Sequence, residues 1–317
     1  MSNSPASLGV QAQWGFGAAN PVTVPCELGP GGDQLKATRS RVMTEGLRGT
    51  RQRIHETTGD GMITIAGDVE IIPTYTPLAA MLPFIMGGTK TGSSNPYTYP
   101  FAETNTNYGS GLQGFYVTSD RKAKVFTYAG VNVAKAVFSA QQGQAMKLAL
   151  SLLAQTETVG ASGTFPSLTY PTDSPFMWSN AVLTLNAVTR AVKDWTLTID
   201  NHPLTDRFNN SQTATQFPFA DFTVTLDCTL PFTADEVDLY NVALLADVGA
   251  TLVLTDTDSV GGPGNIAQHT LTFTLAKMDW PAETPIITGR GEIPTKAKFT
   301  ARKQTQGTAT DCLSITM

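Results

Sequence analysis

The sequence predicts a mainly β protein built as two similar halves, each carrying one short helix. Three observations support this fold class. Apolar residues recur at every second position in several segments, helical spacing is confined to two short segments, and the order of these elements repeats. A period of two is typical of strands, whereas apolar residues three and four positions apart are typical of a helix.

Strict alternation predicts strands with one buried and one wetter face in four segments, 63–71, 195–199, 222–230 and 271–275. Threonine fills many of the wetter positions, and about one residue in seven of the chain is threonine. Its branched carbon favours a strand and its hydroxyl tolerates water. The alternation therefore accounts for the threonine excess.

Two segments break the alternation and predict helices. In the first, Thr76 is expected to act as the cap, and Pro83 is expected to kink or shorten the helix before a Gly-Gly stop. In the second, Thr233 and Glu236 have the spacing of a capping box, and Gly249 is a stop signal after the apolar run.

The two helices occupy matching places, which predicts an internal duplication. In this alignment Glu70 corresponds to Asp227, and the strands before and after each helix also correspond. We expect a first domain over 1–156, a Gly/Ser/Thr/Pro-rich linker over 157–178 and a second domain over 179–317. Because few residues are identical, chance similarity between two β segments is the alternative.

The chain is poor in charge, which excludes several classes. Of its 317 residues 41% are hydrophobic but only 15% charged, against about 25% in ordinary domains. Disordered chains are charge-rich and apolar-poor, and a membrane span needs about 18 consecutive apolar residues, so neither is expected. No signal peptide is expected either. A net charge of −5 and a pI near 5.2 argue against tight nucleic-acid binding.

No catalytic, cofactor or metal site is predicted. Cys26, Cys228 and Cys312 are scattered without a metal-binding spacing, which favours three reduced thiols. The GxGxxG letters at 109–114 lack the preceding strand and following helix that a dinucleotide site needs. Two aspartates within 256–262 fit a hairpin turn better than a calcium loop.

Charge is distributed unevenly along the chain. The stretch 36–53 contains six Lys or Arg and one acid, whereas 208–276 contains eight Asp or Glu and no Lys or Arg. A basic arm of one copy can pair with an acidic surface of another. We therefore predict that Arg48, Arg51 and Arg53, in the basic loop 36–55 that follows the N-terminal arm, contact a neighbouring subunit or ring. The alternative is a plain solvated loop.

Several loose motifs taken together resemble one known family. They are the run 49–53 leading into the Gly-Asp-Val-Glu strand at 67–70, the strand 195–201, and the Gly-Arg-Gly-Glu-Ile-Pro run at 289–294 leading into 296–301. In these features the chain, over roughly 40–302, resembles the major tail tube proteins of long-tailed, siphovirus-like, double-stranded DNA bacteriophages.

The resemblance implies a structural virion protein, not an enzyme, with no cofactor. It implies tail-tube β-sandwich domains, each flanked by a short helix, that close into a ring around a central β-barrel channel. Stacked rings would form the tube that DNA passes through without specific binding. Assembly would occur in the host cytoplasm around a tape-measure protein, with tail terminator and distal tail proteins as further partners and no membrane.

The duplication sharpens this expectation. If each half is one ring domain, three chains give a trimer with pseudo-sixfold symmetry, and a hexamer of single-domain chains is the alternative. Glu70 and Asp227 would then form a ring of carboxylates on a face that lines the lumen. Two other classes stay open, namely an all-β carbohydrate-binding or adhesion module and a hydrolase with an unrecognised carboxylate pair.

Overall fold

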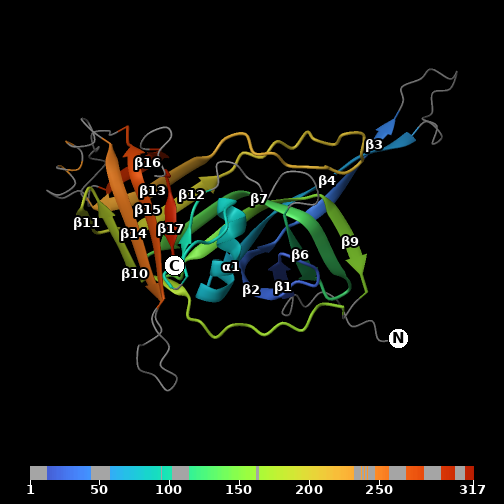
Figure 1. Ribbon diagram of the computed structural model, residues 1–317, viewed down its shortest axis with the longest axis horizontal. Coiled ribbons are helices and arrows are strands. Elements are labelled where there is room, and N and C mark those ends of the chain that lie inside the picture. Colours follow the sequence, from blue (N-terminus) through green and yellow to red (C-terminus); the bar gives the residue numbers. More distant parts are fainter. Residues whose placement is uncertain are drawn as a thin grey trace.

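The computed structural model shows a mainly β chain in which two groups of strands flank one helix (Figure 1). The N-terminal strands lie on the right of Figure 1 and the C-terminal strands on the left. The structure describes residues 13–43, 58–93, 95–101, 114–161, 164–231, 237, 239, 241, 247–256, 269–281, 294–303 and 311–317.

The first half contains a closed antiparallel barrel. Six strands pair in the order β1–β2–β4–β8–β7–β6, and β6 returns to β1. Closure pairs β1 on both edges, whereas β2 meets β1 only over residues 24–26. Trp14, Phe16, Val117 and Tyr128 are fully buried in it. The elements of this half are β1 Gln13–Gly17, β2 Val24–Asp33, β3 Lys36–Met43, β4 Thr58–Ile72, α1 Tyr75–Met86, β5 Thr98–Tyr99, β6 Phe115–Asp120, β7 Val125–Gln141, β8 Lys147–Ala154 and β9 Thr156–Gly160.

Helix α1 forms where the sequence predicts it, but its beginning differs. Thr74 is the capping residue, and the backbone N–H of Thr76 donates to the Asp173 carboxylate at 2.9 Å. Thr76 is therefore the wrong cap, because a distant carboxylate satisfies this end of the helix. Pro83 lies inside the helix without ending it, and Gly87 ends it in the left-handed conformation, as predicted.

The second half forms a curved sheet in the order β12–β13–β16–β15–β14–β10–β11. Its core continues into the first half, where Phe138 of β7 meets Phe273 of β15 with ring centres 5.1 Å apart. Residues 237, 239 and 241 are helical, while the predicted caps Thr233 and Glu236 lie outside the described residues. The strands of this half are β10 Phe176–Leu185, β11 Val188–Arg190, β12 Asp194–Asp200, β13 Thr223–Pro231, β14 Val248–Asp256, β15 Thr270–Asp279, β16 Pro294–Arg302 and β17 Ser314–Thr316.

The pairing scheme of the first half recurs in the second. The pairs β1–β6, β2–β4, β4–β8, β6–β7, β7–β8 and β7–β9 correspond in chain order to β10–β14, β12–β13, β13–β16, β14–β15, β15–β16 and β15–β17. The β1–β2 pair has no counterpart among the described residues, because β10 pairs with β11 instead. The order of elements that the sequence repeats is thus also an order of contacts.

Candidate functional site

The β7–β12 pair joins the two halves into a continuous sheet, and a shorter pair of β5 and β17 also connects them. Over its C-terminal part, β7 pairs with β8 on one edge and with β12 of the second half on the other, from Lys135 opposite Asp200 to Gln141 opposite Asp194. Buried Asn201, directly after β12, donates from its side chain to the carbonyls of Val133 at 3.0 Å and Ile85 at 3.2 Å. We call this β7–β12 pair the seam.

The side of this sheet that faces away from the core is polar, and we call it the polar face. It spans β4, β8, β7, β12, β13 and β16, whose alternate residues are buried on the other side. A typical row runs Glu70, Ala149, Val137, Thr198, Thr225 and Thr300. Small and hydroxyl-bearing side chains therefore dominate the polar face between its charged groups.

Charges on the polar face are nearly balanced. Most carboxylates have a local partner, since Ser151 donates to Asp68 at 2.6 Å and Thr229 donates to Asp194 at 2.8 Å. The face carries five carboxylates and five cations, namely Asp68, Glu70, Asp194, Asp200 and Asp227 with Lys135, Lys147, Lys296, Lys298 and Arg302. Such pairing leaves a weak net field over the surface.

The two predicted acids lie on this same face but not next to each other. Glu70 is on β4 and Asp227 on β13, with β8, β7 and β12 between them. The Glu70 carboxylate lies 3.5 Å from the Lys147 ammonium, and Asp227 lies opposite Lys298 in the strand register. Each predicted acid thus has a lysine beside it, Glu70 by direct contact and Asp227 by strand register.

The glycines of β2 bring its backbone close to Glu70. A Cβ on Gly29 would lie 2.6 Å from a Glu70 carboxylate oxygen, and one on Gly31 would lie 2.9 Å from the Glu70 Cβ. The Gly31 N–H also donates to Glu70 at 3.3 Å. This bulge in the β2–β4 pair therefore favours glycine, most clearly at Gly31, whose N–H helps to hold the Glu70 side chain in place.

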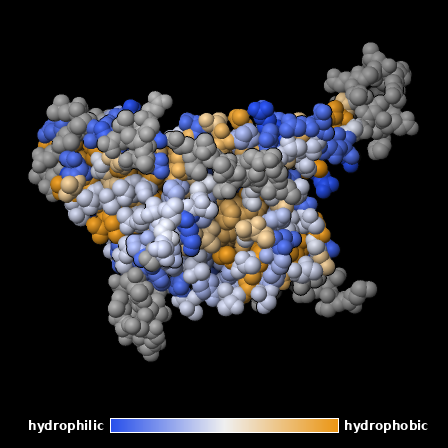
Figure 2. All heavy atoms as spheres, viewed as in Figure 1, coloured by the Kyte–Doolittle hydropathy of each residue, from blue (hydrophilic) through white to orange (hydrophobic). Residues whose placement is uncertain are grey.

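A hairpin of β3 and β4 projects from the body (Figure 1). Arg48, Arg51 and Arg53, the predicted contact residues, lie outside the described residues. The described part is mostly hydrophilic (Figure 2) and carries exposed Lys36 and Arg39. Exposed apolar side chains also occur on this hairpin, at Val42, Met43 and Met62.

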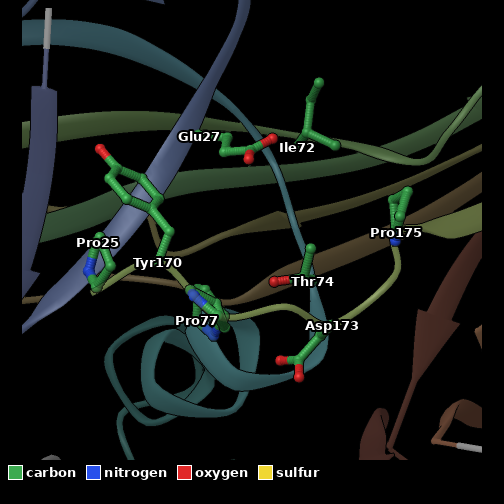
Figure 3. A pocket seen from close by; sticks show the side chains of 9 residues that line it. Pro25, Glu27, Ile72, Thr74, Pro77, Tyr170, Asp173 and Pro175 are labelled. Atoms are coloured by element: carbon green, nitrogen blue, oxygen red, sulfur yellow. The ribbon is translucent and has the colours of Figure 1, made fainter. Parts of the chain in front are cut away.

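A cavity of about 150 Å³ lies between β2, the start of α1 and the segment before β10 (Figure 3). Ligand pockets typically measure about 300–1,000 Å³. Its two carboxylates, Glu27 and Asp173, lie on different sides of the cavity, and Asp173 is already bonded to the first turn of α1. Burial raises the pKa of the Tyr170 phenol that lines it. These acids do not form the converging pair that a hydrolase would need.

Within the described residues, no group of three or more His, Cys, Asp or Glu side chains could hold a metal ion. The three thiols are free, and burial raises the pKa of Cys228 to about 12 and that of Cys312 to about 11. Because the thiolate is the reactive form, these cysteines are poor nucleophiles at neutral pH. No helix in the described part of the chain is long and apolar enough to cross a membrane.

Sequence reasoning did not find the seam or the short strands β9 and β17. Strand β7 is 17 residues long, and its burial pattern loses its alternation near Val131 and Val133. This irregularity hides the pairing of its C-terminal part with β12. The repeated order of elements was the one signal in the sequence that could have pointed to the seam. If one half leaves the edge of a strand unpaired, that edge is expected to find a partner strand elsewhere.

Over the described residues, the fold defines a mainly β protein with a closed six-strand barrel whose sheet continues into a second group of strands. The sequence matches the phage tail tube protein family over residues 2–301. The chain therefore belongs to the phage tail tube proteins, which implies a structural, non-enzymatic role in the tail of the virion and self-assembly into a tube. No curated protein matches the chain.

Proposed function

We propose that three copies of this chain close into one ring of the tail tube, with each half acting as one of six ring domains. The observation that carries the proposal is the seam, a domain-to-domain sheet junction already formed inside one chain. The repeated strand pairs support an origin by duplication, over domains 1–156 and 179–317 joined by 157–178. Stacked rings would form the conduit through which DNA passes during ejection.

The repeated strand pairs support a choice of edges that would join neighbouring chains. Strand β12 corresponds to β2, and β7 corresponds to β15, by the pairs they make within each half. Over Glu27–Asp33, β2 pairs with β4 on one edge and has no strand on the other among the described residues. The continuation of β15 from Asp279 would pair with this edge in the next chain.

The register of the seam predicts a specific contact. Val137 of β7 lies opposite Thr198 of β12. In our alignment of the two halves, Asp279 corresponds to Val137 by burial pattern, and Gln34 corresponds to Thr198 by strand register. Gln34 of one chain should therefore face Asp279 of the next, and both side chains are exposed in the single chain.

A disulfide tests this junction. The double variant Gln34→Cys/Asp279→Cys should oxidise to covalent oligomers, because opposite residues in a strand pair approach within disulfide range. Each single variant is the matched control and should give no ladder. The native thiols should not interfere, because burial raises their pKa and keeps them protonated.

The size of the largest covalent species separates the two ring models. A ladder that ends at three chains supports the trimer, whereas one that ends at six supports a hexamer. Electron microscopy of the same sample should show rings or tubes. Rings without any cross-link would show that the chain assembles through other edges, and an absence of rings and tubes in concentrated wild-type protein would contradict the proposed assembly itself.

We further propose that the polar face lines the lumen, with Glu70 and Asp227 contributing a ring of lysine-balanced carboxylates. Each cation that meets a DNA phosphate adds salt-dependent affinity, so a conduit benefits from few unpaired cations. Virions carrying Thr198→Lys should eject DNA more slowly at low salt and recover at higher salt. Val182→Lys, on exposed β10, is the control. Equal ejection rates at low salt would contradict a lumenal polar face.

The basic residues Arg48, Arg51 and Arg53 are proposed to contact another subunit. Reversing the three charges to Glu should impair polymerisation while the monomer stays folded, because the second half is strongly acidic. Normal tube formation at moderate salt would refute this contact. The tape-measure, tail terminator and distal tail proteins are the partners proposed for the assembled tube, which would form in the host cytoplasm.

A further inference from the structure

We propose that the β3–β4 hairpin packs across the second half of a neighbouring copy in the same ring. This inference rests on the ring proposed above and specifies a lateral contact within it. The template lies inside the chain, where residues 202–220 of the second half pack across the first half. The partner is therefore a second copy of this chain.

Residues 202–220 form an irregular hairpin. Leu204 N donates to Pro218 O at 2.8 Å, and Thr215 N donates to Arg207 O at 2.9 Å. In Figure 1 this excursion of the chain between β12 and β13 runs along the first half toward the β3–β4 hairpin. We call it the inner hairpin.

The tip of the inner hairpin makes firm contacts with the first half. Ile63 N donates to Gln212 O at 2.7 Å, so the tip pairs with the edge of β4. The Gln155 side chain donates to Thr215 O at 2.6 Å. Phe217 is only 6% exposed. The inner hairpin is thus a docked element, in which Ala214 and Phe217 are buried.

The β3–β4 hairpin occupies the corresponding place in the first half. It lies between β2 and the part of β4 that pairs with β2, as the inner hairpin lies between β12 and β13. However, it projects from the body, and Val42 and Met62 keep 58% and 54% of their surface exposed. Exposed apolar side chains on a projecting hairpin are typical of a contact surface. The missing contact is the one that a neighbouring chain would supply.

Charge favours the second half as the partner surface. Lys36, Arg39 and Arg41 are exposed along the projecting hairpin. At the base of the inner hairpin, Asp221 is exposed, and Asp206, which lies 3.7 Å from neighbouring Arg207, keeps 80% of its side chain exposed. Opposite charges of this kind favour association between copies and disfavour contact between two projecting hairpins.

The repeat also indicates where the hairpin should dock. Ile63 receives the inner hairpin, and its counterpart in the second half is Ala220, given that Glu70 corresponds to Asp227. Ala220 and Leu204 are exposed at the base of the inner hairpin. The docking surface is therefore Leu204, Ala220 and Asp221 of the neighbouring chain.

A charge-insertion pair tests the apolar part of the contact. Val42→Asp/Met62→Asp should weaken ring formation about tenfold or more, measured by native mass spectrometry across a concentration series. Val182→Asp/Val188→Asp is the matched control, since these valines are similarly exposed on β10 and β11. Both variants should keep the wild-type circular dichroism and melting temperature. Equal ring formation by the two variants would overturn the proposal.

A cross-link distinguishes a lateral from an axial contact. Met62→Cys/Ala220→Cys, treated with a short bismaleimide, should give a covalent ladder that ends at the ring size. A ladder that extends beyond the ring would place the hairpin on the next ring and overturn the proposal. Rings without this cross-link would also overturn it, while the ring itself would stand. If the Gln34–Asp279 cross-link does not form and no rings are observed, the proposed ring itself is refuted.

Discussion

Asn201 provides a direct test of the energy that the seam contributes to the single chain. Its side-chain NH2 donates to two main-chain carbonyls, Val133 O at 3.0 Å and Ile85 O at 3.2 Å, from a position that is only 2% exposed. Asn201→Ala removes both donors and leaves two carbonyls without them. Leaving a buried polar group unsatisfied costs about 1–3 kcal/mol.

This loss should be measurable by thermal unfolding. Unfolding entropy near 60 °C is about 2.1 cal/mol/K per residue, or about 0.67 kcal/mol/K for a chain of this length. A destabilisation of about 2 kcal/mol therefore lowers the melting temperature by about 3 °C. Asn201→Asp should cost more than Asn201→Ala, because it also buries a charge beside carbonyl oxygens.

The control is Asn180→Ala, on the second-half strand β10 and away from the seam. It should change the free energy of unfolding by less than about 0.5 kcal/mol, as half-exposed polar positions usually do. Calorimetry and urea unfolding should agree on the ranking of the three variants. If Asn201→Ala stays within about 0.3 kcal/mol of wild type, or Asn180→Ala costs as much, the side chain does not fasten the seam.

Two further substitutions test local packing. Gly67→Ala should destabilise the protein by about 2 kcal/mol or more, because its Cβ would lie 2.3 Å from the backbone oxygen of Gln34. Gly59→Ala on the same strand, whose nearest atom would be 4.0 Å away, should be neutral or slightly stabilising in urea unfolding. Asp256→Ala should lower the free energy of unfolding by about 2–4 kcal/mol. The fully buried Asp256 carboxylate lies 2.7 Å from Nδ1 of His269 and accepts a hydrogen bond from the His269 backbone N–H at 3.1 Å. A melting temperature unchanged from wild type would contradict that role.

The sequence predicted the parts of the fold that depend on local pattern. Alternation located the strands around Val69, Leu197 and Phe273, because a half-buried strand repeats every two residues whatever its partner. The first helix was found by its apolar spacing. Its cap was not, because the Asp173 carboxylate that bonds Thr76 lies almost a hundred residues away.

The seam could not be predicted from local pattern, since strand pairing is non-local. Strand β7 bends near Gly130, which has a positive φ of 65°, and its register with β8 shifts between Val133 and Lys135. The resulting irregular burial looks like a broken strand. Similarly, β17 has only three residues, and its place against β15 and β5 depends on partners far away in the sequence.

The covalent joining of two halves changes the physics of the proposed ring. A ring of six separate domains would form every junction by association, and each event costs translational and rotational freedom. Here half of the junctions are seams within a chain, where Lys135 already faces Asp200 at high effective concentration. In the proposed ring, the first half presents a basic hairpin and the second half an acidic surface. Unlike halves give a heterologous, head-to-tail contact, which forms a closed ring where the rotation between copies closes, and their unlike charges disfavour pairing between like halves.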